Sequence, residues 1–206
     1  SGHLVLSTGY GTSGNSGALF LGSGASTTGR GGSVYVTVGS GDSGSGGEMK
    51  LMAGSSSAAT GGRLSVISGV GGGSTSGALV LQVADAATLG GMAVLSTGAA
   101  SSGNSGSLYI GSGAATDGRS GSVHVTAGTG DSGDGGEMTI TAGTSTATAT
   151  GGRMSIVTGF SSTSTSGALL LRTHDAGSKG ESGHLVLSTG YGTSGNSGAL
   201  FLGSGA

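Results

Sequence analysis

The sequence predicts an all-β fold, a parallel β-solenoid (β-helix) of about fourteen 15-residue coils. Three observations predict it. Glycines that open a Gly-x-apolar-x-apolar run recur in steps of nearly 15 residues, both apolar positions stay apolar along the chain, and the first 25 residues return unchanged at 182–206. Because the repeats are equivalent and about eight residues separate consecutive runs, stacked parallel rungs explain the pattern better than hairpins do.

The composition is unlike that of an ordinary globular protein, since 51 of the 206 residues are Gly, none is Pro and only 8% are charged. Collagen is excluded because it needs glycine at every third position together with proline. Glycine and serine enrichment is also typical of disorder, but disordered segments lack aliphatic residues at fixed spacing. The regular spacing of aliphatic residues here therefore favours an ordered repeat.

Each repeat is numbered from its opening glycine, which is position 1. The openings are Gly2, Gly17, Gly32, Gly47, Gly62, Gly77, Gly91, Gly106, Gly121, Gly136, Gly152, Gly167, Gly183 and Gly198. Positions 3 and 5 are apolar in every repeat, with Ala93 as the one weak member. Alternation places these two positions on one face of a strand and positions 2, 4 and 6 on the other. We therefore expect positions 3 and 5 to be buried.

The second half of each repeat supplies the bends. Position 7 is small, and position 8 is glycine except at Ala84 and His174. A glycine after a strand tolerates the backbone angles of a tight bend. Stretches such as GYGTSGNS and GSSSAATG offer mainly small residues, so we expect a thin, two-sided coil in which Ser, Thr, Ala and Gly pack against the aliphatic ladder.

A second level of repetition lies above the 15-residue repeat. Residues 4–49 recur with small changes 89 residues later, which divides the chain into six-coil blocks at about 2–90 and 91–182. Two blocks make a 181-residue unit, 1–181, and the next unit begins at 182. We expect one continuous solenoid over 1–206, taken from a long tandem array of this unit.

Charged side chains in matching columns of neighbouring coils are expected to form ion pairs. The pairs are Glu48 with Arg63, Glu137 with Arg153, and Arg119 with Asp134. Exposed pairs of this kind stabilise a protein by only about 0 to 1 kcal/mol. Their expected role is to fix the register of the coils.

Outward position 4 carries large apolar residues at intervals, and runs of exposed apolar residues usually mark a contact surface. We expect this set to form a lateral interface between copies of the protein; the alternative is that a tail or loop of a longer protein covers it. The set is Val5, Phe20, Tyr35, Val80, Val94, Tyr109, Leu170, Val186 and Phe201.

Two motifs were weighed for ligand binding. Gly9, Gly11 and Gly14 satisfy GxGxxG after an expected strand, but a dinucleotide site requires a helix to follow, and no helical pattern does. The stretch GTGDSGDGGE around Asp131 and Asp134 is similar to calcium-binding repeats, yet its spacing differs from theirs. Calcium binding there stays open.

Catalysis is not expected, because no Ser/His/Asp or paired-carboxylate set recurs and the four histidines are scattered. No cofactor is expected. A net charge of -2 without a basic patch argues against nucleic acid as a partner, and no apolar run has the length of a membrane span. The absence of cysteine excludes a disulfide framework and leaves the compartment open.

Coils such as SGALFLGSG and GGSVYVTVG resemble those of Gly/Ser/Thr-rich β-solenoid repeat proteins, and in particular the very long low-complexity tandem-repeat proteins of microalgae. The resemblance covers the whole chain and implies an extracellular or cell-surface structural role. Insect antifreeze β-solenoids are also similar in repeat length, but their uniform Thr-x-Thr column is missing here.

These observations predict a structural repeat protein. We expect an extracellular filament or scaffold that forms by solenoid stacking and lateral self-association. The alternative is an ice-binding or glycan-binding module.

Overall fold

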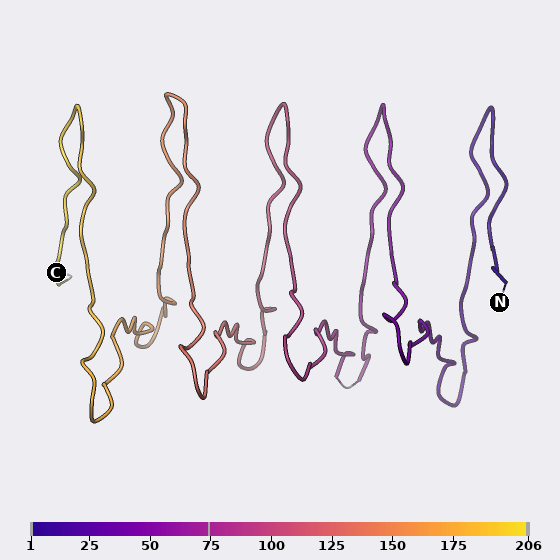
Figure 1. Ribbon diagram of the computed structural model, residues 1–206, viewed down its shortest axis with the longest axis horizontal. Helices are drawn as coiled ribbons and strands as arrows, with labels where there is room; N and C mark the ends of the chain where they lie inside the picture. Colours follow the sequence, from indigo (N-terminus) through magenta and orange to yellow (C-terminus); the bar gives the residue numbers. More distant parts are fainter. Residues whose placement is uncertain (1, 74, 205–206) are drawn as a thin grey trace. The chain divides into compact units, whose positions relative to one another are not determined.

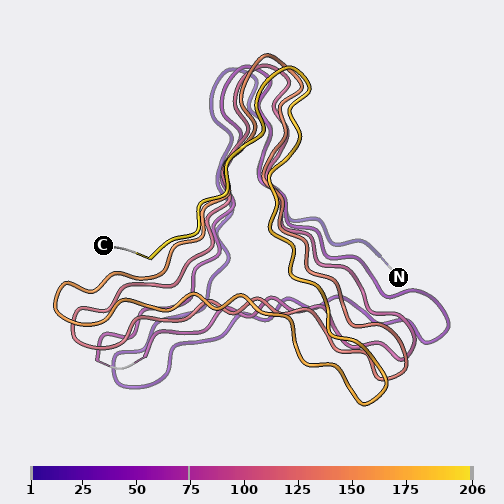
Figure 2. The ribbon, with the colours of Figure 1, turned by 90° about the vertical axis from the view of Figure 1, so that its left-hand side faces the viewer.

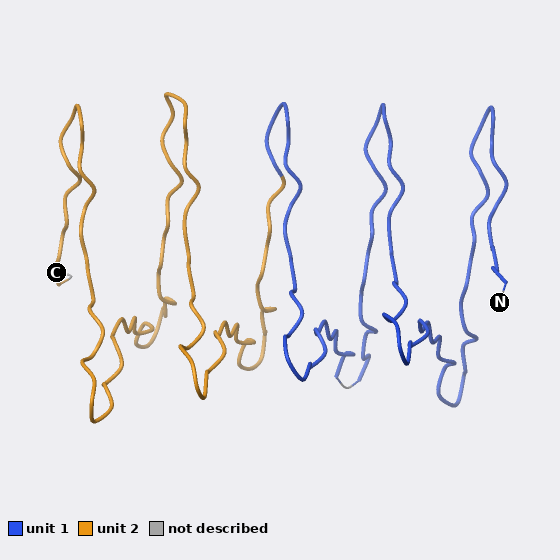
Figure 3. Cartoon of the chain, viewed as in Figure 1, with its two compact units in different colours: residues 1–105 blue, residues 106–206 orange. Residues whose placement is uncertain are grey.

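The computed structural model describes residues 2–73 and 75–204. The chain divides into two compact units, Ser1–Ser105 and Gly106–Ala206 (Figure 3). The second unit begins at Gly106, which is the opening glycine of a repeat. Both units are built from the same 15-residue repeat, so one description of the repeat serves for each of them.

The expected all-β solenoid is wrong. Residues 2–73 and 75–204 contain no helix and no β-strand, and the ribbon is drawn without a coil or an arrow (Figure 1). In this part of the chain, every backbone–backbone hydrogen bond joins residues three to nine apart in sequence. Stacked rungs would need bonds between residues about one repeat apart, so the repeats do not form a sheet.

Each repeat instead forms an open loop that runs out to a tip and back (Figure 2). The tips are sharp bends that recur with the repeat, so the periodicity predicted from the sequence is confirmed in the path of the backbone. Within the described residues the bends lie at 12–14, 27–29, 42–44, 57–59, 72–73, 87–88, 101–103, 116–118, 131–133, 147–149, 162–164, 178–180 and 193–195.

The outgoing and returning arms of the loop meet between the position 8 glycine and the next opening glycine, and we call this place the neck. The N–H of the next repeat's opening glycine donates a hydrogen bond to the carbonyl oxygen of the position 8 glycine, at 2.8 to 3.1 Å. In the described residues the neck bonds join Gly32 to Gly24, Gly47 to Gly39, Gly62 to Gly54, Gly77 to Gly69, Gly136 to Gly128, Gly152 to Gly143 and Gly167 to Gly159. The position 8 glycine thus marks the neck of the loop, and the sharp bend lies further along the chain.

Position 7 explains why the opening residue is glycine. A Cβ added at Gly47 would lie 2.5 Å from Val38 Cγ1, and one added at Gly32 would lie 2.9 Å from Ser23 Cβ. The Ser23 hydroxyl also donates a hydrogen bond of 2.7 Å to the carbonyl oxygen of Gly32. The side chain at position 7 therefore fills the space that a side chain at the next position 1 would need.

Position 10 is small in every repeat for which it is present, and it shapes the tip in two ways. Where it is serine, its hydroxyl oxygen accepts a hydrogen bond from the N–H three residues later, as from Gly29 to Ser26 at 3.0 Å and from Ala59 to Ser56 at 2.9 Å. Where it is glycine, backbone oxygens approach closely. A Cβ added at Gly130 would lie 2.9 Å from the carbonyl oxygens of Gly133 and Asp134.

Glycine has a second use in two tips. Gly103 and Gly118 both stand at position 13 and have φ values of 126° and 149°. These angles lie in the region that residues with a Cβ rarely adopt. The repeats that begin at Gly91 and Gly106 therefore need glycine to complete their bends.

The small residues, and not the aliphatic ones, occupy the interior of the loops. In the described part of the chain, the residues shielded to an intermediate degree are all at position 7 or position 10: Ser68, Gly71, Ala142, Thr158, Ser161 and Gly192. The expected burial of positions 3 and 5 is therefore wrong. Where the arms close, position 7 carries Ser, Thr or Ala in most repeats and Val at Val38 and Val83, which are the least exposed of the large apolar side chains.

We expect Gly47→Ala to open the neck between residues 39 and 47, because the new methyl group would collide with Val38. Amide exchange at residue 47 should become roughly fivefold faster, which corresponds to the loss of one hydrogen bond. Gly39→Ala is the matched control, since a Cβ at Gly39 meets nothing within 4 Å. Equal exchange rates in the two variants would contradict the role of the neck contact.

The absence of a buried apolar core among the described residues makes a second prediction. Cooperative unfolding and its heat-capacity change come from exposing a core that the native state buries. We expect the dilute chain to show no cooperative heat-absorption peak in scanning calorimetry. A sharp transition at low protein concentration would contradict the open-loop structure.

Candidate interaction surface

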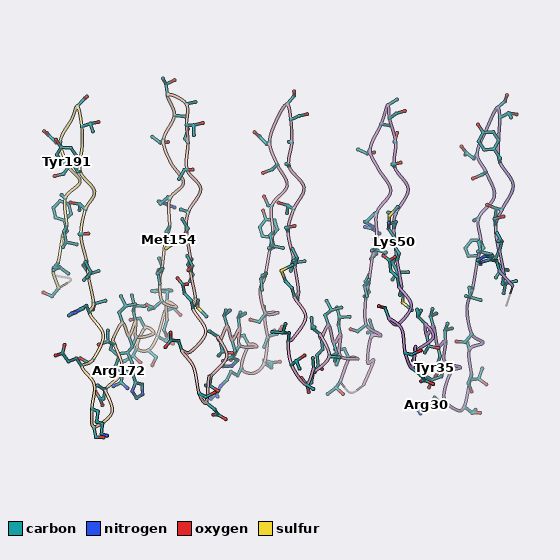
Figure 4. All side chains as sticks on the ribbon, in the orientation of Figure 1. Arg30, Tyr35, Lys50, Met154, Arg172 and Tyr191 are labelled. Carbon is teal, nitrogen blue, oxygen red and sulfur yellow. The ribbon has the colours of Figure 1, made fainter. Side chains whose placement is uncertain are left out.

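Large apolar side chains throughout the chain are exposed to solvent. No side chain in residues 2–73 and 75–204 is buried, whether apolar or polar. Figure 4 shows the side chains standing on bare backbone, with labelled examples such as Tyr35, Met154 and Tyr191. So many exposed apolar side chains without a buried core are unusual for a soluble monomer. Large exposed apolar patches usually mark interaction surfaces.

The apolar columns differ in how far they are exposed. Position 3 side chains are 46% to 61% exposed, apart from Leu4 at 86%. The nine side chains of the expected lateral interface are more open, at 70% to 91%. Position 5 side chains are 55% to 87% exposed, so they overlap in exposure with the outward column, and position 3 is the least exposed of the three apolar columns.

The structure places the members of this outward column on separate repeats, each in the extended run of its own loop. They comprise Val5, Phe20, Tyr35, Val80 and Val94 in the first unit, and Tyr109, Leu170, Val186 and Phe201 in the second. Each is an exposed large side chain, as a contact surface requires. Whether they contact another copy stays a prediction.

A further exposed apolar set was missed in the sequence. Tyr10, Val70, Phe160 and Tyr191 are 88% to 93% exposed and all stand at position 9, directly after the neck glycine. Their shared position was a usable signal. It was overlooked because the loop halves of the repeats were treated as uniformly small.

The exposed area shows how much surface the chain leaves uncovered. The accessible surface is 20370 Å² for a mass of 18.9 kDa. A compact monomer of that mass exposes about 8,300 Å², and a fully unfolded chain about 27,000 Å². The protein therefore presents about 12,000 Å² more surface than a compact globule would.

The expected ion pairs stay a prediction. The pairs Glu48–Arg63, Glu137–Arg153 and Arg119–Asp134 were expected from stacked neighbouring coils, and that stacking is absent. What the structure shows is local: Thr139 Oγ1 donates a hydrogen bond of 3.0 Å to Glu137 Oε1 within one run.

The described residues form no enclosed binding site. This part of the chain has no pocket, and it holds no group of three or more His, Asp or Glu side chains that could bind a metal ion. Asp131 and Asp134 lie in a bent tip, and no helix follows Gly14 to complete a dinucleotide motif. Any contact that the described residues make is therefore made through exposed surfaces.

Outside the four residues left undescribed, no helix has the length and apolarity needed to cross a membrane. Comparison with protein-family models, with curated proteins and with solved structures found no match.

The exposures predict the reactivity of the tyrosines. Tyr10, Tyr35, Tyr109 and Tyr191 are 87% to 92% exposed. We expect all four to be iodinated at the rate of a free tyrosine in dilute protein, as measured by mass spectrometry of peptides. A protected tyrosine at low concentration would reveal a tertiary contact that the open loops lack.

Proposed function

We propose that this chain is a structural repeat protein that builds a filament or scaffold by lateral association of copies through the outward column. The observation that carries the proposal is the exposed surface, because a chain with this much uncovered apolar area gains free energy by covering it. Each Å² of apolar area removed from water contributes about 25 cal/mol.

Sequence repetition supports a second copy as the partner. The outward column recurs with the repeat and again with the 89-residue block, so two copies present matching groups along their lengths. Weak contacts that repeat along a chain sum to strong association, since each contact raises the effective concentration for the next. A net charge of -2 over 206 residues also lets copies approach without strong repulsion, and it offers no basic patch for nucleic acid.

The role is structural and not enzymatic, and its proposed place is outside the cell or on its surface. An inert surface rich in hydroxyl groups and poor in charge supports that location. The alternative of an ice-binding or glycan-binding module stays a prediction.

The test replaces two members of the outward column by lysine in the full chain. Phe20 and Tyr109, both 91% exposed, lie in different units. We expect Phe20→Lys with Tyr109→Lys to raise the protein concentration at which assembly begins by about tenfold or more, because each change removes a large apolar group from the contact. Light scattering and electron microscopy measure the onset and the form of the assemblies.

The control is a pair of equally exposed aromatic residues outside the column. Tyr10 is 92% exposed and Phe160 is 88% exposed, and both stand at position 9. Tyr10→Lys with Phe160→Lys adds the same charge and removes similar apolar area, so it should leave assembly near the unmodified level. An equal loss in both double variants would refute the outward column as the interface, and undiminished bundling in the test variant would do the same.

A further inference from the structure

We propose that the extended runs, positions 2–7 of each repeat, pair through backbone hydrogen bonds with the runs of a second copy. The inference rests on the proposed self-association and adds how the copies are joined. The side chains of the outward column bring the copies together, and the backbone then connects them.

The first observation is the set of backbone groups that have no partner. In the described residues, every neck bond uses a glycine at position 1 as donor and a glycine at position 8 as acceptor. Throughout that part of the chain, positions 2–7 take no part in backbone–backbone bonds. A folded protein has about one hydrogen bond per residue, two-thirds of them between backbone groups. Each run therefore offers a free row of donors and acceptors.

The second observation is that few groups in the runs discourage pairing, Lys50 being the one lysine among them. Exposed strand edges in natural proteins are protected by proline, lysine or bulges. This chain has no proline, and only 8% of its residues are charged. In each run, the apolar side chains at positions 3 and 5 lie on one side and position 4 lies on the other. Two runs side by side in the same register therefore place positions 3 and 5 opposite positions 3 and 5, and position 4 opposite position 4.

The third observation concerns the occupant. A stable pair of proteins buries roughly 1,600 Å² in total, and the chain exposes about 12,000 Å² beyond a compact globule. A second copy has runs of the same length, separated by loops of the same size, so pairing in one repeat aligns the next. An unrelated partner would match one run but not the series, which is why we assign the surface to a second copy of this chain.

The neck and tip keep these runs apart within one copy. In the seven described repeats whose loops are closed by a neck bond, the run is presented at a fixed point of the repeat and is flanked by small residues. Pairing between copies therefore leaves the loops unchanged and uses only groups that are free in the single chain.

The experiment removes backbone donors while retaining every apolar side chain. Ser65, Thr139 and Ser155 are polar residues at position 4 of three runs. In the full chain, Ser65→Pro, Thr139→Pro and Ser155→Pro together delete three N–H groups. We expect the threshold concentration for assembly to rise by about tenfold or more, since proline cannot donate to a strand ladder. Alanine at the same three positions is the matched control and should leave the threshold nearly unchanged.

A second control places prolines in the loop tips, at Ser57, Ser132 and Ser162, where no pairing is proposed. These changes should have little effect on the threshold. Independently, fibre diffraction of the unmodified assemblies should show a spacing of about 4.7 Å, and infrared spectra should gain a sheet band only as protein concentration rises.

The outcomes separate this inference from the proposed function. If the unmodified chain assembles but shows neither the spacing nor the band, or if the run prolines have no more effect than the tip prolines, backbone pairing is overturned while lateral association stands. If the unmodified chain stays monomeric at all concentrations, both are overturned and the surface belongs to another occupant. Assembly that needs added lipid vesicles would likewise overturn the second copy as partner.

Discussion

The contact between the position 7 side chain and the bare backbone of the next opening glycine determines the rest of the structure. In the seven described repeats that have a neck bond, this contact accompanies the hydrogen bond from that glycine to the position 8 carbonyl oxygen. The same closeness leaves space at the neck for one side chain, that of position 7, which is valine at its largest. The aliphatic residues then have no interior to enter, and they stand on the outside of the runs.

This arrangement explains a composition that otherwise looks contradictory. Glycine and serine are needed at the neck and tip, where Cβ atoms would meet backbone or side-chain atoms. The large apolar residues at positions 3, 4 and 5 take no part in closing a single loop. Their strict spacing therefore points to a requirement that operates between molecules, because residues that cover nothing within one chain gain their free energy only when a neighbour covers them.

The sequence predicted the repeat well, but not what surrounds the runs. The 15-residue period could be seen from spacing alone, and the bends recur with it. The sequence also assigns the tight bend to the glycine at position 8, and this is wrong, because that glycine accepts the neck hydrogen bond and the bend lies further along the chain. Alternation at residues such as Leu19 and Leu21 predicts a buried strand face, and that prediction is wrong. Alternation shows which side chains share a side of an extended run. It does not identify what that side packs against, and here nothing in the same chain does.

The sequence predicts that the outward column is exposed. Its composition does not point to the second exposed set, the apolar residues at position 9. Tyr10 and Phe160 lie within stretches dominated by small residues, so composition concealed them. The steric reason for glycine at position 1 also lay beyond sequence reasoning, since it depends on where position 7 points in space. Only coordinates show that Val38 approaches the backbone of Gly47.

Three repeats depart from 15 residues, and each still brings position 7 to the next opening glycine. In the 14-residue repeat a Cβ at Gly91 would lie 2.8 Å from Val83 Cγ1. In one 16-residue repeat Gly152 bonds to Gly143 at 2.8 Å across nine residues, and in the other Thr173 approaches Gly183. The approach of position 7 to the next opening glycine thus tolerates a tip that is one residue shorter or longer. A replication slip that adds or deletes one codon in a tip is absorbed where it occurs, so a gene built from such repeats can lengthen, shorten and diverge while every other loop keeps its shape.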